Sequence, residues 1–172
     1  MGLIHLYCGN GKGKTTAATG LSVRCAGAGG RVIFCQFGKD GTSSELRVLE
    51  NVPGIRVLVC PERFGFYKRM SEETREKAQA AYTALLEKAL AAAAEEAELL
   101  VLDEAVSAMN HGMIPEDRVL DFLDRKPGGL EVVVTGREPP EALQQRADYI
   151  TEMVKRKHPF DQGIAARKGI EF

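Results

Sequence analysis

The fold is decided by a short stretch near the N-terminus that reads Cys8-Gly9-Asn10-Gly11-Lys12-Gly13-Lys14-Thr15-Thr16. An apolar segment over residues 3–8 precedes it, and a segment of helical composition follows from about residue 14 to residue 28. A glycine-rich turn that ends in Gly-Lys-Thr between a strand and a helix is typical of a phosphate-binding P-loop. Cys8 stands where the common pattern has its first glycine. The alternative is a glycine-rich turn with a chance lysine, but strand, loop and helix together favour phosphate binding.

The residue types of this stretch suit a triphosphate. Glycines at positions 9, 11 and 13 allow the backbone to curl, so that several N–H groups converge on phosphate oxygens. The start of the following helix adds the positive end of its dipole. Lys14 supplies a compact positive charge, and the Thr15 hydroxyl can bind Mg²⁺. We therefore expect nucleotide contacts from Gly9, Asn10, Gly11, Lys12, Gly13, Lys14, Thr15 and Thr16.

Further strands and helices alternate along the rest of the chain. Strands are predicted over residues 31–37, 55–60, 99–102, 130–135 and 149–154. Helices are predicted near residues 45–50, from an N-cap at Ser71 to about residue 97, and over residues 115–124 and 140–146. This alternation predicts an α/β, P-loop NTPase-like three-layer sandwich with a mostly parallel sheet of about six strands. With 172 residues and no linker or repeat, we expect one domain over residues 1–172.

Composition excludes several classes of protein. The net charge is −1, which provides no general attraction to nucleic acid or to an anionic membrane. No apolar run approaches the ~20 residues of a membrane span, and the N-terminus lacks the basic region of a signal peptide. The four cysteines and three histidines show no metal-binding spacing. We expect a cytoplasmic protein with buried cysteines, no metal site built by protein side chains alone, and neither nucleic acid nor membrane as a partner.

An acidic pair ends the apolar strand over residues 99–102. Asp103 and Glu104 follow it directly. Because the carboxyl ends of parallel strands share one edge of the sheet, we expect the pair near the glycine-rich loop. Thr15, Asp103 and Glu104 are the candidate Mg²⁺ ligands. Either acid can hold the ion directly or through a water molecule. The alternative is an exposed acidic pair without a ligand.

The second lysine within the loop, Lys12, makes the stretch unusual. It resembles the loop of the P-loop cob(I)alamin adenosyltransferases, also called corrinoid adenosyltransferases, in which a residue other than glycine at the Cys8 position is normal. The resemblance extends over essentially the whole chain. It includes Gln36-Phe37 with Lys39 and Gly41, Leu102-Asp103-Glu104, Thr135-Gly136-Arg137, Lys157-His158-Pro159-Phe160-Asp161-Gln162-Gly163 and Gly169-Ile170-Glu171-Phe172.

The resemblance implies a transferase of cobalamin biosynthesis. Co(I) of a reduced corrinoid attacks the ribose 5′ carbon of ATP, triphosphate leaves, and adenosylcobalamin forms; ATP lies along the loop in the opposite sense to most P-loop enzymes. ATP, a corrinoid and Mg²⁺ are therefore the expected ligands. The cobalt is itself the nucleophile, so the protein positions the substrates and stabilises the leaving group. The candidate catalytic residues are Lys14, Thr15, Glu104 and Arg137.

Three basic residues have two interpretations each. Arg137 follows a strand on the same sheet edge as the loop, which makes it a candidate contact for the triphosphate, or equally a solvated loop arginine. Lys12 and Lys39 present the same choice, and Lys12 is the stronger candidate because it lies within the loop.

An aromatic loop carries Phe64-Gly65-Phe66 between a strand and the long helix. The spacing resembles the family's Phe-x-Trp pair, whose rings pack beneath the corrin and exclude the lower axial ligand, with phenylalanine here where tryptophan is common. Phe64 and Phe66 are therefore candidate corrinoid contacts. The alternative is ordinary packing in the core or at a dimer interface.

The resemblance also implies partners, and two other functions compete with it. Family members are commonly homodimers, a reduced flavoprotein is the expected electron donor, and many members have an N-terminal extension that can cover the site, whereas this sequence begins two residues before Leu3. One rival function is a kinase or NTPase acting at the γ-phosphate, with Glu104 as base. The other is a non-catalytic module that binds ATP or a corrinoid.

Overall fold

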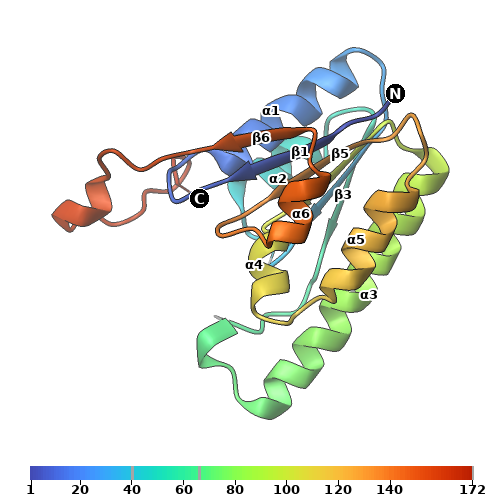
Figure 1. Ribbon diagram of the computed structural model, residues 1–172. Helices are drawn as coiled ribbons and strands as arrows, with labels where there is room; N and C mark the ends of the chain where they lie inside the picture. Colours follow the sequence, from blue (N-terminus) through green and yellow to red (C-terminus); the bar gives the residue numbers. More distant parts are fainter. Residues whose placement is uncertain (40, 66, 172) are drawn as a thin grey trace.

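A six-stranded, fully parallel sheet forms the centre of the protein, in a computed structural model that describes residues 1–39, 41–65 and 67–171 (Figure 1). The strand order is β3-β2-β4-β5-β1-β6. The strands are β1 (Ile4–Cys8), β2 (Val32–Gln36), β3 (Ile55–Val59), β4 (Leu99–Asp103), β5 (Glu131–Thr135) and β6 (Tyr149–Glu152). The helices are α1 (Lys14–Gly27), α2 (Ser44–Leu49), α3 (Glu72–Glu96), α4 (Ala105–Asn110), α5 (Glu116–Arg125) and α6 (Glu141–Arg146), with 3-10 turns at Tyr67–Arg69 and Pro159–Gln162.

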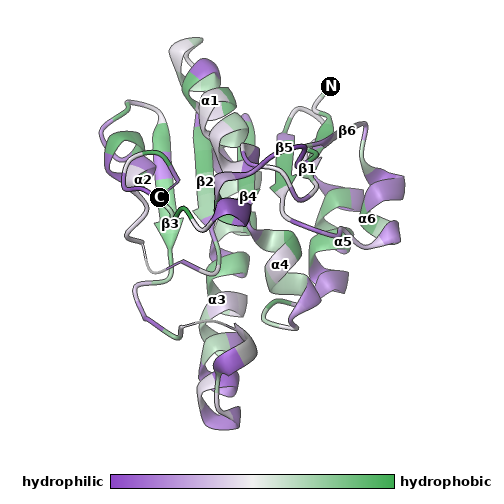
Figure 2. Ribbon diagram, turned by 90° about the vertical axis from the view of Figure 1, so that its left-hand side faces the viewer, coloured by the Kyte–Doolittle hydropathy of each residue, from purple (hydrophilic) through white to green (hydrophobic). Residues whose placement is uncertain are grey.

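Helices cover both faces of the sheet, which confirms the predicted three-layer α/β architecture. Successive residues of a strand point to opposite faces, and β4 shows this directly. Leu99 and Val101 pack in the cluster that contains α1 and α2 residues, whereas Leu100 and Leu102 pack in the larger cluster beneath α3, α4, α5 and α6. Every residue of β4 is buried, and the strand is a continuous apolar run up to its last residue, Asp103. Strand β2, which is also buried throughout, is mostly green in Figure 2.

All the predicted strands and helices are present. The sheet is parallel throughout, in agreement with the predicted, mostly parallel sheet. The last strand ends at Glu152 instead of residue 154. Helix α4 was not predicted, because most of its residues are buried and no alternation of exposed and buried faces marks it in the sequence. The predicted N-cap is confirmed: Ser71 accepts a hydrogen bond from the Thr74 N–H at 3.2 Å.

The cysteines behave as predicted from their spacing. All four are free; Cys8, Cys35 and Cys60 are buried, and Cys25 is half-buried. Across the described ranges, no helix has both the length and the apolar character that crossing a bilayer requires.

Candidate functional site

A cavity of about 670 Å³ opens at the carboxyl edge of the sheet, where the glycine-rich loop joins β1 to α1. Its volume falls within the range of sites for nucleotide-sized ligands. The walls come from the loop, from α1 and α2, from the ends of β4 and β5, and from the C-terminal segment, defined here as residues 155–171. The cavity thus lies where ligands bind in open parallel sheets.

Two of the loop glycines are required by the chain that passes behind them. After β6, Met153 lies against the loop: its carbonyl accepts the Gly11 N–H at 2.5 Å, and its own N–H donates to the Cys8 carbonyl at 2.9 Å. A β-carbon on Gly9 or Gly11 would lie 2.6 Å from the Met153 carbonyl oxygen. The Gly11 N–H is therefore engaged away from the cavity, and no pattern in the sequence indicates this partner.

Lys14 is held inside the loop rather than extended into solvent. Its Nζ donates to the carbonyls of Gly9 and Gly11, each at 2.8 Å, and the residue is 7% exposed. Burial lowers the pKa of this ammonium group, and the nearby Arg137 guanidinium lowers it further. The loop carbonyls therefore orient a cation at the floor of the cavity before any anion arrives.

Asp103 lies behind the cavity, at the centre of a buried polar cluster. Thr135 Oγ1 donates to its Oδ1 at 2.8 Å, and Gln36 Nε2 and Thr15 Oγ1 donate to its Oδ2 at 2.9 and 3.2 Å. Asp103 and Thr135 are completely buried. The carboxylate therefore fixes the Thr15 hydroxyl from behind, and side chains from β2 and β5 hold that carboxylate in place.

Glu104 turns from the end of β4 into the cavity wall. Its backbone adopts the left-handed conformation (φ 59°), which is uncommon outside glycine, and its N–H donates to Thr135 Oγ1 at 2.9 Å. This turn separates the two acids, so that Asp103 points behind the cavity and Glu104 contributes to its surface. Burial, and then the Asp103 charge, raise the pKa of the Glu104 carboxyl.

Most predicted site residues meet at this cavity. Its walls include Asn10, Gly11, Lys12, Gly13, Lys14, Thr15, Thr16, Lys39, Glu104 and Arg137. Gly9 contributes through the carbonyl that holds Lys14, and Asp103 through Thr15. Lys39 also pairs with Glu45 on α2, with 3.8 Å between Nζ and Oε1. Arg137 is exposed at the mouth of the cavity. The preceding residue, Gly136, packs closely on α4, because a β-carbon there would lie 2.6 Å from the Val106 β-carbon.

Phe64 of the aromatic loop is not among the residues that line this cavity. Phe64 packs at the edge of the larger core cluster, with its ring 5.8 Å from the Tyr82 ring of α3 in an edge-to-face contact. Tyr67 makes the same kind of contact with Tyr82 at 6.1 Å. The contacts of Phe64 agree with the packing interpretation of this loop. Phe66 lies outside the described residues.

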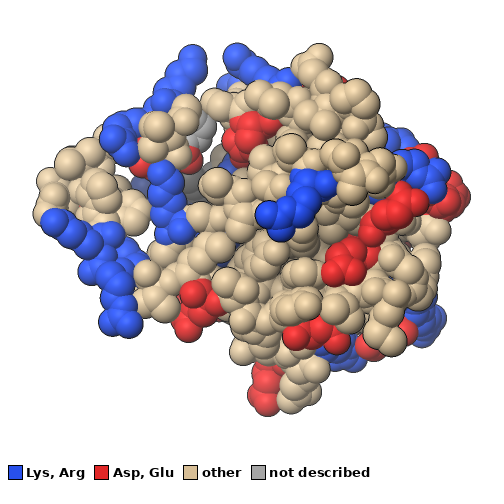
Figure 3. All heavy atoms as spheres, turned by 90° about the horizontal axis from the view of Figure 1, so that it is seen from above, with Lys and Arg blue, Asp and Glu red and all other residues tan. Residues whose placement is uncertain are grey.

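The C-terminal segment forms one wall of the cavity, and no role was predicted for it from the sequence. His158, Ala166, Gly169, Ile170 and Glu171 all line the cavity. Seen from above (Figure 3), basic side chains gather on the side of the molecule where this segment extends in Figure 1. The signal available in the sequence was the tail motif around His158, whose composition indicates no particular chemistry by itself.

The residues present fit Mg²⁺ bound together with phosphate. Within the described ranges, no group of three or more His, Cys, Asp or Glu side chains could hold a metal ion. Mg²⁺ commonly keeps several waters and binds through one or two protein oxygens plus substrate phosphates, so a full set of protein ligands is not required. The Thr15 hydroxyl and the Glu104 carboxyl are oxygen groups in the cavity wall beside Lys14.

Comparison with known proteins gives a consistent family. The sequence model described as ATP:corrinoid adenosyltransferase BtuR/CobO/CobP matches residues 1–172. A corrinoid adenosyltransferase of Pseudomonas aeruginosa is 36% identical over 99% of this chain and 84% of its own length. Corrinoid adenosyltransferase CobA of Salmonella typhimurium is 32% identical and a corrinoid adenosyltransferase of Escherichia coli K12 is 31% identical, each over 99% of this chain and 86% of its own length.

The match covers the glycine-rich loop, the acidic strand end and the C-terminal segment, which are the regions that surround the cavity. The chain therefore belongs to the ATP:corrinoid adenosyltransferase family.

Proposed function

We propose that this protein transfers the adenosyl group of ATP to the Co(I) of a reduced corrinoid and releases triphosphate. The observation that carries the proposal is the geometry of Lys14, buried among loop carbonyls at the floor of a nucleotide-sized cavity, in a chain of this family. In the reaction, the cobalt electron pair forms a cobalt–carbon bond as the bond between C5′ and the triphosphate oxygen breaks. The displaced electron pair stays on the triphosphate.

The residues around the cavity suit the stabilisation of that leaving group. Negative charge develops on the triphosphate oxygen, so donors already fixed nearby lower the barrier without reorganising. Lys14, Lys12 and Arg137 contribute cationic groups, and the remaining loop N–H groups contribute dipoles. The nucleophile comes from the substrate, so no side chain has to become covalently attached.

Thr15 and Glu104 are the proposed Mg²⁺ ligands, with Asp103 acting through Thr15. Asp103 already accepts three hydrogen bonds and is fully buried, which favours an orienting role over direct coordination. A Mg²⁺ ion bound here neutralises charge on the triphosphate. The pKa of Glu104 is raised by burial, and a nearby cation offsets this effect because it stabilises the charged form of the carboxyl.

The decisive experiment is an anaerobic assay with chemically reduced Co(I) cobalamin and Mg-ATP. Loss of the Co(I) absorbance, a light-sensitive product and an equal amount of triphosphate are expected. If Co(I) persists with cobalamin, cobinamide is tested next, and persistence with both contradicts the proposal. Release of orthophosphate instead of triphosphate supports a kinase-like enzyme, and binding without turnover supports a non-catalytic module.

Three expectations about partners and the corrinoid site remain predictions. A homodimer and a reduced flavoprotein as electron donor follow from the family resemblance. The corrinoid is expected against the aromatic loop, with Phe64 and Phe66 beneath it. Substitution of Phe64 by Ala, with the corrinoid spectrum recorded in the presence of ATP, tests whether this loop excludes the lower axial ligand.

A further inference from the structure

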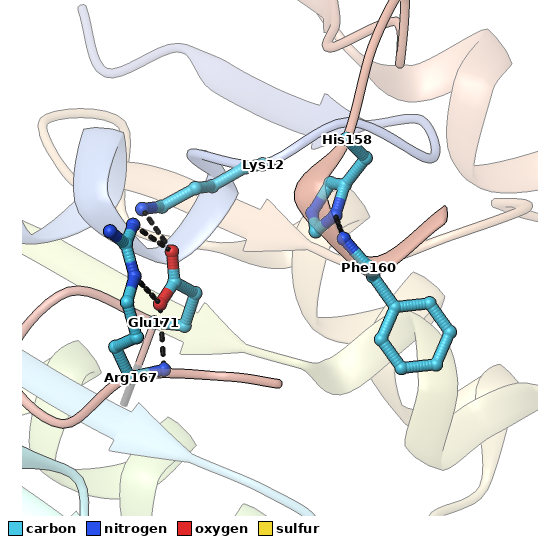
Figure 4. A network of polar contacts seen from close by, with 5 residues as sticks. All are labelled: Lys12, His158, Phe160, Arg167 and Glu171. Atoms are coloured by element: carbon cyan, nitrogen blue, oxygen red, sulfur yellow. Dashed lines mark hydrogen bonds and ion pairs between the residues drawn. The ribbon is translucent and has the colours of Figure 1, made fainter. Parts of the chain in front are cut away.

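The end of the C-terminal segment lies against the glycine-rich loop and places a carboxylate in the cavity wall. Residues 159–162 form a 3-10 turn, and the chain then returns until Glu171 faces Lys12 (Figure 4). Both Lys12 and Glu171 line the cavity. Loop and tail are 159 residues apart in sequence, so only the folded chain brings these charges together.

The Glu171 carboxylate is held by four donors. Lys12 Nζ donates to Oε1 at 3.3 Å, and Arg167 Nη2 donates to the same oxygen at 3.0 Å. Arg167 Nε and the Arg167 backbone N–H donate to Oε2 at 3.2 and 2.8 Å. A guanidinium that engages both oxygens, a backbone N–H and an ammonium group are also the donors that proteins use to bind a phosphate.

These contacts resist protonation of the carboxylate, and the Glu171 side chain is 20% exposed. Hydrogen bonds from Arg167 lower the pKa of Glu171 to about 2. The side chains of Lys12 and Arg167 are 47% and 59% exposed. Exposed ion pairs of this kind contribute little to stability. A ligand with several negative charges therefore competes easily with the single charge of Glu171.

We propose that Lys12 and Arg167 form a second anion subsite beside the phosphate loop, which the Glu171 carboxylate occupies until the triphosphate group displaces it. The inference rests on the proposed function for the identity of the ligand. In this arrangement, Arg167 exchanges an internal carboxylate for a phosphate, and Glu171 lowers the apparent affinity for nucleotide and for the triphosphate product.

The test is calorimetric titration of full-length protein with inorganic triphosphate and Mg²⁺, without any corrinoid. Glu171→Gln removes the competing charge and is expected to tighten binding about three- to fivefold, the scale of an exposed ion-pair network. Adding Arg167→Gln to that variant is expected to weaken binding about tenfold, because a charge-assisted contact to phosphate is lost. Lys168→Gln removes the same charge from the exposed neighbouring residue and serves as the matched control, with affinity within twofold of the parent.

The double variant separates a ligand from a simple counter-ion. If Arg167 only holds Glu171, then Arg167→Gln has no effect once Glu171 is Gln, and the proposal is overturned. It is equally overturned if Glu171→Gln leaves the affinity unchanged or weakens it, or if neither wild type nor Glu171→Gln binds triphosphate. Thermal melting checks that each variant folds, and Lys12→Gln in the Glu171→Gln background tests the same subsite from the loop side. Triphosphate binding as expected, together with Co(I) that persists in the adenosylation assay, refutes the proposed function and retains the subsite.

Discussion

The cavity has two walls that are built in different ways. Residues 9–14 are fixed by backbone contacts: Met153 fits against Gly9 and Gly11, and Lys14 is held between two carbonyls. The C-terminal segment is held by exposed ion pairs, such as Lys155 Nζ with Asp161 Oδ1 at 2.9 Å. Both walls face the same ligand space, but the first is constrained by close packing and the second by charge.

The difference shows that the two walls suit different tasks. The packed wall holds donors in fixed positions, whereas the ion pairs of the C-terminal segment can exchange one partner for another. Electrostatic stabilisation of a leaving group depends on donors that are oriented in advance, which the packed wall provides. Ion pairs in water are weak and replaceable, so the charged wall can open for a ligand of higher charge at low cost. We therefore expect substitutions in the loop to have large effects and substitutions in the C-terminal segment to have small ones.

The largest effect is expected from Lys14→Ala. The change removes the cation at the floor of the cavity, and the rate of adenosyl transfer should fall on the order of 10²–10³-fold or more. The measurement is the anaerobic Co(I) assay under saturating Mg-ATP. Lys88→Ala, on an exposed position of α3, is the control and should retain full activity. A rate within tenfold of wild type for Lys14→Ala would show that the loop cation does not stabilise the leaving group.

Gly11→Ala tests the packing of the loop wall. The new methyl group would lie 2.6 Å from the Met153 carbonyl oxygen, so the loop or residues 152–154 must shift, at a cost of about 1–3 kcal/mol. The melting temperature should fall by several degrees. In contrast, Gly20→Ala, at a helical position with no atom within 4 Å of the added carbon, should leave the protein equally or more stable. Equal melting temperatures for Gly11→Ala and wild type would refute the constraint.

A smaller, pH-dependent effect is expected from Glu104→Gln. Burial raises the pKa of Glu104 in the folded protein, so ionisation opposes folding. This cost is absent below the ordinary carboxyl pKa and grows as the pH rises through the raised folded value. Urea unfolding at several pH values from 4 to 8 should show Glu104→Gln gaining stability relative to wild type as the pH increases. A difference that is independent of pH would contradict the raised pKa.

The smallest effect is expected from Asp161→Asn, which breaks an ion pair of the charged wall. The two side chains, Lys155 and Asp161, are 36% and 51% exposed, so the free energy of unfolding should change by less than about 0.5 kcal/mol. The melting temperature should stay within about 2 °C of wild type. A loss as large as that of Gly11→Ala would mean that the C-terminal segment folds cooperatively with the sheet.

Sequence patterns predicted the elements that depend on local chemistry. Buried strands such as β4 show as continuous apolar runs, and the N-cap Ser71 shows as a polar residue before an apolar helical repeat. Helix α4 was not predicted from the sequence because all but two of its six residues are buried. The alternation between exposed and buried faces, by which helical spacing is detected, is therefore absent. The hydrogen-bond partners of Asp103 could not be predicted for another reason. Gln36 and Thr135 come from β2 and β5, and only the order of the strands in the sheet makes them neighbours of Asp103.

The sequence by itself determined the α/β fold class, the prediction of phosphate binding by residues 9–16 and the family resemblance, because each depends on residue types at short, fixed spacing. Only the tertiary structure decided how the two acids divide between orientation and cavity surface, why Gly9 and Gly11 cannot carry a β-carbon, and that Glu171 reaches Lys12. The contacts of Thr15 with Asp103, of Gly11 with Met153 and of Lys12 with Glu171 each join residues 88 or more positions apart. Neighbours of that kind are set by tertiary packing and not by local spacing.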